Sequence, residues 1–176
     1  MKAFLFLIMT VALLLGKGAK LPTYEQPGSS TSTTAVKVTG ISFETTDRDG
    51  NTVTQDVLGK NTLTMLNFWE PWCGPCVGEM PDLEKLSRAY ADRGFAILGI
   101  YSTEGMEGDV DDVLSDTGVS YTILHYTDAF DRFQTGYVPT TVFVDRDGHV
   151  IGDGADAFHI GSNSYEGWAG IIEGLL

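Results

Sequence analysis

Only two cysteines occur in the chain, Cys73 and Cys76, and two residues separate them. A disulfide framework that stabilises a small domain uses more cysteines, usually widely spaced, and a bridge across so short a loop removes little chain entropy. A structural zinc site needs four ligands, and His125, His149 and His159 have no ligand-like spacing to a partner. We therefore interpret the pair as a redox centre, in which a dithiol and a disulfide interconvert, and we expect no metal.

The cysteines lie where a predicted strand passes into a predicted helix. A run rich in strand formers spans Leu63–Trp69, and apolar residues recur at spacings of three or four from about Cys73 to Arg93. The start of a helix carries unpaired N–H groups and partial positive charge, and both favour a thiolate over a thiol. We expect a lowered pKa for the thiol of Cys73, which makes it the attacking nucleophile. Cys76, one turn further in, is placed to resolve a mixed disulfide.

The residues beside the cysteines suit the same chemistry. Gly74 leaves room for another chain to approach, and Pro75 occupies the helix start, where a missing N–H costs little. Trp72, which directly precedes the first cysteine, is expected to line the surface that a partner contacts. Trp69 and Trp168 are expected to pack in the core.

Hydrophobic periodicity and turn signals predict the remaining elements. Two strands around a turn at 49–51 open the domain, strands and helices then alternate, and a hairpin around Asp147–Gly148 precedes a closing helix. That order predicts a mixed sheet with helices on both faces. The predicted strands lie within 36–53 and at 63–69, 95–101, 121–124, 140–144 and 149–151, and the predicted helices at 73–93, 107–116, 128–135 and 165–176.

Residues 1–19 have the pattern of a secretory signal peptide: a charged start, an apolar run broken once by Thr10, and a small-residue exit. The run is shorter than the ~20 residues that span a bilayer comfortably, and an uncleaved membrane anchor through residues 3–16 is the alternative. Residues 20–34 are rich in Pro, Gly, Ser and Thr, which predicts a flexible linker, and one globular domain is expected over 35–176. Both interpretations place the domain outside the cytoplasm, in the periplasm, at the cell surface or secreted.

The formal net charge of −13 argues against nucleic-acid binding, because polyanions repel an acidic chain. No cluster of basic and aromatic residues offsets this charge, and the acidic residues between 104 and 116 are interpreted as a solvated helix face. Two Asp-Arg-Asp-Gly runs, at 47–50 and 145–148, look like fragments of calcium loops. Their glycine falls at the fourth position, whereas an EF-hand loop needs it at the sixth, so we interpret both runs as hairpin turns.

Three features together resemble the thioredoxin superfamily, and most closely its TlpA/ResA-like branch of exported thiol–disulfide oxidoreductases. They are Trp-Cys-Gly-Pro-Cys at 72–76, Pro81, and Val-Pro-Thr-Thr at 138–141 ahead of a strand and turn. The resemblance covers about residues 35–176. It implies an α/β fold, a thioredoxin-like three-layer α/β/α sandwich with a mixed central sheet, an N-terminal β-hairpin and a central βα insertion.

The same resemblance implies roles for residues far from the cysteines in sequence. It implies a cis peptide bond before Pro139, which would then face the cysteines, although the residues alone favour an ordinary trans proline. It also implies that the backbone of Val138 pairs with an extended substrate strand. The candidate substrate-binding residues are therefore Trp72, Gly74, Pro75, Val138 and Pro139.

Two positions depart from the thioredoxin pattern. Thioredoxin has a buried Asp six residues before the first cysteine, where this chain has Asn67, which cannot exchange a proton. Glu79, three residues after Cys76, matches a glutamate of the TlpA/ResA-like branch. We predict that Glu79 helps to deprotonate Cys76, and a solvated helix glutamate is the alternative. Glu70 and Pro71 stand where small or weakly polar residues are commoner, so we expect a surface charge beside the site.

The predicted function is dithiol–disulfide exchange that reduces disulfides of exported partner proteins, with Cys73, Cys76 and Glu79 as catalytic residues. No cofactor is expected beyond the redox-active disulfide. Electrons would come from another dithiol protein, a membrane protein being one candidate. The chain is expected to act as a monomer. Two alternatives remain: a peroxiredoxin-like peroxidase, and a non-catalytic binding module that its disulfide switches.

Overall fold

The computed structural model describes residues 40–103 and 105–176. The expected signal peptide or anchor at 1–19, the linker at 20–34 and the first residues of the expected domain lie outside the described residues. Within the described ranges, no helix combines the length and the apolar character that a membrane crossing requires.

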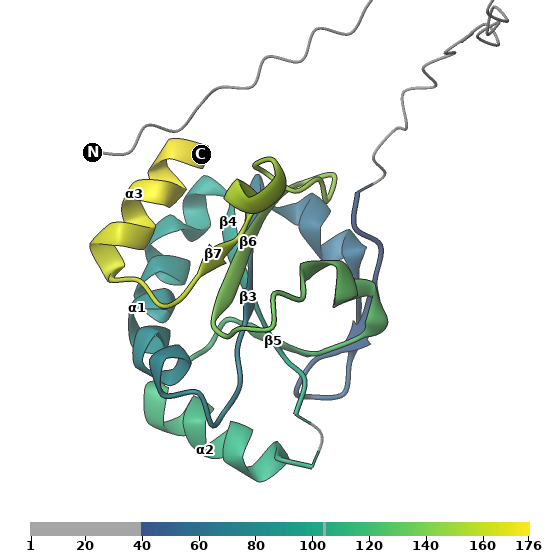
Figure 1. Cartoon of the computed structure of the whole chain (residues 1–176), viewed down its shortest axis with the longest axis vertical. Helices are drawn as coiled ribbons and strands as arrows, with labels where there is room; N and C mark the ends of the chain where they lie inside the picture. The colour runs from purple at the N-terminus through teal and green to yellow at the C-terminus, as the bar shows by residue number, and fades with distance from the viewer. Residues whose placement is uncertain (1–39, 104) are drawn as a thin grey trace, which may run out of the picture. The chain divides into compact units, whose positions relative to one another are not determined.

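A five-stranded mixed sheet forms the centre of the domain (Figure 1). It consists of β3 (Leu63–Phe68), β4 (Phe95–Tyr101), β5 (Thr122–His125), β6 (Thr140–Asp145) and β7 (His159–Ile160). The strand order is β5-β4-β3-β6-β7, in which β3, β4 and β5 run parallel and β6 is antiparallel to both of its neighbours. All six residues of β3 are buried, as expected for a central strand covered on both faces.

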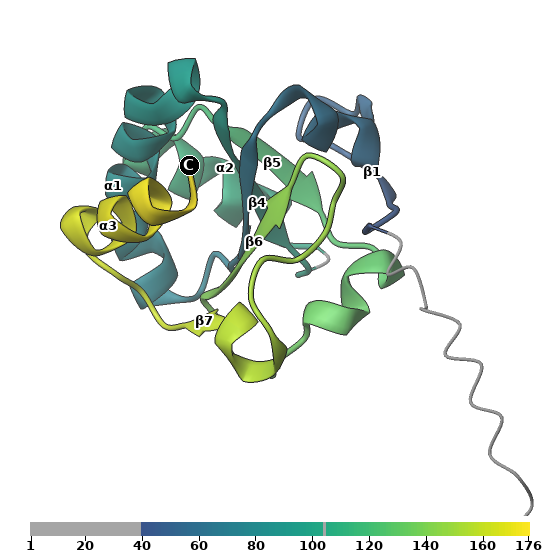
Figure 2. The same cartoon turned by 90° about the horizontal axis from the view of Figure 1, so that it is seen from above.

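Three α-helices cover one face of this sheet (Figure 2). They are α1 (Gly74–Tyr90), α2 (Glu107–Thr117) and α3 (Tyr165–Leu175). Of the apolar residues of α1 that recur every three or four positions, Met80, Leu83 and Leu86 are fully buried. They pack in one core with Phe143 of the sheet and Trp168 of α3. Both cysteines belong to this core, so the packing of α1 sets their position.

A β-hairpin and two 3-10 helices cover the opposite face. They are β1 (Glu44–Thr46), β2 (Thr52–Thr54), η1 (Gln55–Lys60) and η3 (Asp128–Phe133). Leu58 of η1 and Phe130 of η3 belong to a second core on this face. Adjacent residues of β3, such as Met65 and Leu66, belong to different cores because successive side chains of a strand point to opposite faces.

The predicted three layers, N-terminal hairpin and central βα unit (α2 and β5) are confirmed, with two differences in detail. The helix predicted at 128–135 is the 3-10 helix η3, in which Phe130 and Phe133 lie three residues apart and turn to the same side. The strand predicted at 149–151 is reduced to one bridge, between Val144 and Val150. Gly152 follows with a φ of 104°, and the chain turns through η4 (Gly154–Ala157) before β7 completes the sheet.

Candidate active site

Cys73 and Cys76 form a disulfide at the first turn of α1, with an S–S distance of 2.05 Å and Cα atoms 5.3 Å apart. Cys73 is the capping residue of the helix, and its Sγ accepts a hydrogen bond from the N–H of Cys76 at 3.3 Å. This N–H is one of the donors that a helix start leaves unpaired. It would therefore also stabilise a thiolate at Cys73 once the disulfide is reduced.

Both cysteine residues are buried, and Cys73 is slightly more exposed than Cys76. Cys73 is 5% exposed and Cys76 only 1%. Gly74 is exposed, and a Cβ at this position would have no neighbouring atom within 4 Å, so the backbone between the cysteines is open to a partner. Pro75 lies in the first turn of α1, where its missing N–H leaves no bond unmade. A partner can thus approach Cys73 while Cys76 stays behind it.

The loop before β6 lies against the disulfide. The Val138–Pro139 peptide bond is cis, as the resemblance implies. The carbonyl oxygen of Val138 lies 3.7 Å from the Sγ of Cys73. Pro139 accepts a hydrogen bond from the N–H of Gly161 at 2.9 Å, which ties the loop to the end of β7. No described residue accepts a hydrogen bond from the N–H of Val138, so this donor can pair with an added strand.

Three large hydrophobic side chains are exposed on the described part of the chain, Trp72, Tyr137 and Ile160. Trp72 directly precedes the first cysteine and Tyr137 directly precedes the cis-proline loop. Ile160 lies in β7, which pairs with the start of β6. Tyr137 also lines a groove together with Phe133 and Val138. Exposed apolar side chains beside the disulfide and the cis-proline loop suit a surface that binds a partner.

Glu79 is buried, with only 4% of its surface exposed, so the solvated-glutamate alternative is wrong. Its Oε2 accepts hydrogen bonds from the backbone N–H of Asn163 at 3.1 Å and from Nε1 of Trp168 at 3.2 Å. Burial raises the pKa of Glu79 above its ordinary value, and the hydrogen bonds only partly oppose this rise. Glu79 follows Cys76 by three residues, a spacing that places both on the same side of α1. A buried, protonatable carboxyl group therefore shares that side with the second thiol.

Asn67 connects this carboxyl group to the sheet. Its Nδ2 donates to Oε1 of Glu79 at 3.2 Å and to Oγ1 of Thr141 at 3.1 Å. An ionised Asp at this position could not donate either bond. The contacts of Glu79 with Asn163 and Trp168 could not be predicted from the sequence, because these partners lie 84 and 89 residues away and no motif marks them.

The surface charge expected from Glu70 is absent, because Glu70 is buried and only 6% exposed. Its carboxylate accepts hydrogen bonds from the backbone N–H and the hydroxyl group of both Ser102 and Thr103. The strand register explains this contact: Phe68 pairs with Ile100 in the parallel strands β3 and β4, so the residues two positions later meet at the same edge. The sequence holds one signal for this contact that the prediction did not use. An acidic residue follows β3, and two hydroxyl residues follow β4, the parallel neighbour of β3.

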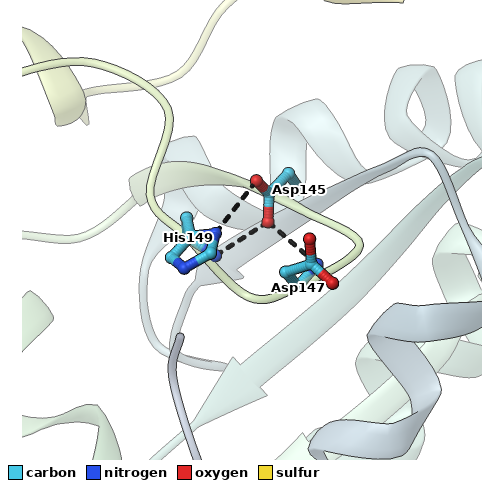
Figure 3. A group of neighbouring side chains, drawn as sticks. All are labelled: Asp145, Asp147 and His149. Carbon is cyan, nitrogen blue, oxygen red and sulfur yellow. Dashed lines mark hydrogen bonds and ion pairs between the residues drawn. The ribbon is translucent and has the colours of Figure 1, made fainter. Parts of the chain in front are cut away.

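Asp145, Asp147 and His149 form a cluster of possible cation ligands at the turn after β6 (Figure 3). Oδ1 of Asp145 accepts hydrogen bonds from the N–H groups of Asp147 at 2.9 Å and His149 at 2.8 Å. Oδ2 of Asp145 lies 3.3 Å from Nδ1 of His149. These bonds close the turn, as an Asp at the start of a tight turn commonly does. The predicted hairpin-turn role accounts for the cluster.

The chain is similar to known proteins in sequence and in fold. The sequence model of the AhpC/TSA family matches residues 36–152. The thiol-disulfide oxidoreductase ResA of Geobacillus kaustophilus is 31% identical over 149 residues, which are 82% of this chain and 84% of the relative. ResA of Oceanobacillus iheyensis is 33% identical over 97 residues, 54% of this chain, and the match spans about half, 49%, of that relative. A solved thiol:disulfide interchange protein of the thioredoxin family from Chlorobium tepidum superposes with a TM-score of 0.66 at 26% identity, covering 77% of this chain and 94% of that one.

Proposed function

This chain belongs to the AhpC/TSA family, and on that premise we propose that it is a thiol–disulfide oxidoreductase that reduces disulfides of partner proteins. The observation that carries the proposal is the Cys73–Cys76 disulfide, which caps α1 and lies against the cis Val138–Pro139 loop. Two relatives that carry the name thiol-disulfide oxidoreductase support it.

The partner would bind as an extended segment. Its backbone carbonyl accepts from the N–H of Val138, which has no acceptor among the described residues. Pro139 holds this donor beside the disulfide, and the exposed backbone of Gly74 and Pro75 lets the segment pass close to Cys73. Apolar groups of the partner pack on the exposed Trp72.

Catalysis starts from the reduced form of the protein. The thiolate of Cys73 attacks one sulfur of the partner disulfide, and a bond forms between Cys73 and that sulfur. The bond between the two partner sulfurs breaks, and the departing thiolate takes a proton from water. The partner is now held as a mixed disulfide, with Cys76 behind the new bond.

The second thiol then releases the partner. Glu79 accepts the proton of Cys76, and the resulting thiolate attacks the Sγ of Cys73. This restores the Cys73–Cys76 disulfide, and the second partner sulfur leaves as a thiolate and is protonated. Two electrons and two protons have passed to the partner, which is now a dithiol.

A dithiol protein outside this chain returns the two electrons by the same exchange in reverse, so no metal or organic cofactor enters the reaction. We propose the reducing direction because Gly74–Pro75 resembles the dipeptide of reducing members of the superfamily. The signal-like pattern at residues 1–19 supports partners outside the cytoplasm.

The test is the reduction of insulin disulfides by dithiothreitol with and without the protein. The wild-type protein should accelerate the reaction, and Cys73→Ser should not. Full acceleration by Cys73→Ser would refute the proposal and favour a binding module. Turnover of hydrogen peroxide, measured in the same reductant without insulin, decides the peroxidase alternative.

A further inference from the structure

Trp72 is exposed over 63% of its surface, yet its indole ring is tied to the protein. Nε1 of Trp72 donates a hydrogen bond to Oγ1 of Thr103 at 3.2 Å. Thr103 lies just after β4, so the bond joins the active-site turn to the neighbouring strand end. The side chain next to the nucleophile is thereby restricted before any partner arrives.

The indole N–H of Trp72 can only donate, and Glu70 determines where the hydroxyl group of Thr103 donates in turn. A threonine hydroxyl has one proton, and an ionised carboxylate can only accept. The hydroxyl of Thr103 donates to Oε2 of Glu70, which leaves its lone pairs for the indole N–H of Trp72. The two bonds run in one direction, Trp72 to Thr103 to Glu70, and hydrogen bonds in such a chain polarise one another favourably.

The carboxylate of Glu70, which ends this series of hydrogen bonds, is itself held in place by further donors. Besides the Thr103 hydroxyl, the carboxylate of Glu70 accepts from the N–H of Thr103 at 3.2 Å, and from the N–H and the hydroxyl of Ser102 at 2.9 and 2.5 Å. Four donors match the approximately four lone-pair positions of a carboxylate. The carbonyl oxygen of Glu70 also accepts from the N–H of Cys73 at 3.0 Å, which links the same residue to the nucleophile.

We propose that Glu70 and Thr103 are positioning residues that hold the Trp72 indole in a fixed orientation beside Cys73, and that this orientation selects protein disulfides over small ones. The inference rests on the proposed function and names a determinant of its substrate class. A pre-positioned aromatic ring contacts a polypeptide without losing rotamer freedom on binding. A small disulfide reaches the sulfur without using the ring.

Two single substitutions separate this role from a structural one. Thr103→Val removes the hydroxyl group that receives the Trp72 bond, and Ser102→Ala removes the other hydroxyl bond to Glu70 without touching Trp72. Thr103→Ser restores the hydroxyl group and serves as the rescue variant. Both main variants lose one hydroxyl hydrogen bond to the same carboxylate, and only Thr103→Val also loses the bond from Trp72.

The first readout is the motion of Trp72. Trp69 and Trp168 are each 1% exposed, so a mobile, acrylamide-quenchable tryptophan signal reports on Trp72. Thr103→Val should add a fast component to the fluorescence anisotropy decay, whereas Ser102→Ala and Thr103→Ser should keep the wild-type decay. An unchanged decay in Thr103→Val would overturn the positioning role.

The second readout is substrate selectivity, the ratio of kcat/KM for insulin to kcat/KM for 5,5′-dithiobis(2-nitrobenzoate). The ratio should fall about three- to tenfold in Thr103→Val, through KM for insulin, because the ring must then be ordered on binding. It should return to the wild-type value in Thr103→Ser. Equal losses for both substrates would overturn the selectivity role. A wild-type protein that turns over neither disulfide would refute the proposed function and the selectivity with it, while the anisotropy result decides the positioning of Trp72 separately.

Discussion

Oε2 of Glu79 accepts a hydrogen bond from Nε1 of Trp168 at 3.2 Å, and this bond joins the helix that begins at the cysteines to the last helix of the chain. It places a carboxyl group and an indole inside the core that also contains both cysteines. A buried carboxyl group on the same side of α1 as the second thiol is what a proton acceptor for that thiol requires.

Glu79→Gln should slow the release of the partner from the mixed disulfide by about a hundredfold, the typical contribution of a positioned general base. In the wild-type protein the release rate should rise with pH through the raised pKa of Glu79, because only the ionised carboxylate accepts the proton. The variant should lack this rise. Rapid-quench trapping of the mixed disulfide between pH 5 and pH 9 measures both effects.

Glu84→Gln is the control, since Glu84 is also a nearly buried glutamate of α1 but bonds to Ser120 and Arg88, away from the cysteines. It should leave the release rate and its pH profile as in the wild type. If Glu79→Gln also leaves both unchanged, Glu79 has no part in the mechanism.

The free energy of unfolding should depend on pH because Glu79 is buried. Burial gives this carboxyl group a higher pKa in the folded protein than its ordinary value of 4.5, so the folded state binds the extra proton between these two values. The free energy of unfolding contributed by Glu79 should therefore fall as the pH rises through that window. Urea unfolding of wild type and Glu79→Gln from pH 4 to pH 8 isolates this contribution as a difference.

Burial lowers the pKa of His159, so the contribution of His159 to the free energy of unfolding should rise with pH. His159 is present in both proteins, and its contribution therefore cancels in the difference between them. A difference that stays constant across the whole pH series would show that Glu79 titrates normally in the folded protein.

Asn67→Asp should destabilise the protein by about 2 kcal/mol at pH 8, because it replaces a donor to Glu79 with a second buried carboxylate. The loss should be smaller at pH 5, where one of the two groups can hold a proton and donate it. Urea unfolding at the two pH values tests this. Asn61→Asp, at a half-buried amide that donates to a backbone carbonyl, is the control and should show no such pH dependence. Equal losses for Asn67→Asp at both pH values would contradict the contact.

Gly99→Ala should cost about 1–3 kcal/mol, the usual cost of overpacking a filled core. A Cβ at this position of β4 would stand 2.6 Å from Cδ1 of Ile123 and 3.1 Å from Cε2 of Tyr121. Gly108→Ala is the matched control in α2, where a Cβ has no neighbour within 4 Å, and it should stabilise the helix by about 0.5–1 kcal/mol. Thermal unfolding of both variants measures these changes in stability. If Gly99→Ala leaves the stability unchanged, this part of the core is loosely packed.

The central part of the site could be predicted from the sequence because it depends on residues that are close together in the sequence. A buried strand, a turn and a helix start with two cysteines lie within one short segment, and each has its own residue pattern. The cis bond before Pro139 was predictable only through family resemblance, since the residues around it also suit a trans bond.

The surroundings of Glu70 and Glu79 and the edge of the sheet depend on contacts between segments that are far apart in the sequence. The burial of Glu70 follows from the register of β4 against β3, which no local pattern specifies. The partners of Glu79 come from the segment around α3 for the same reason. At 149–151 the strand-forming residues are present, but Gly152 turns the chain away, and the edge strand β7 has too few residues to show periodicity.

The most direct test of the account uses reduced Cys76→Ala, in which Cys73 can capture a partner disulfide but nothing can release it. Mixed with oxidised insulin, it should form a covalent adduct that dithiothreitol cleaves and that mass spectrometry locates at Cys73. The double variant Cys73→Ser with Cys76→Ala should form none. If reduced Cys76→Ala forms no adduct although its Cys73 thiol reacts with iodoacetamide, Cys73 is not the nucleophile of a disulfide exchange.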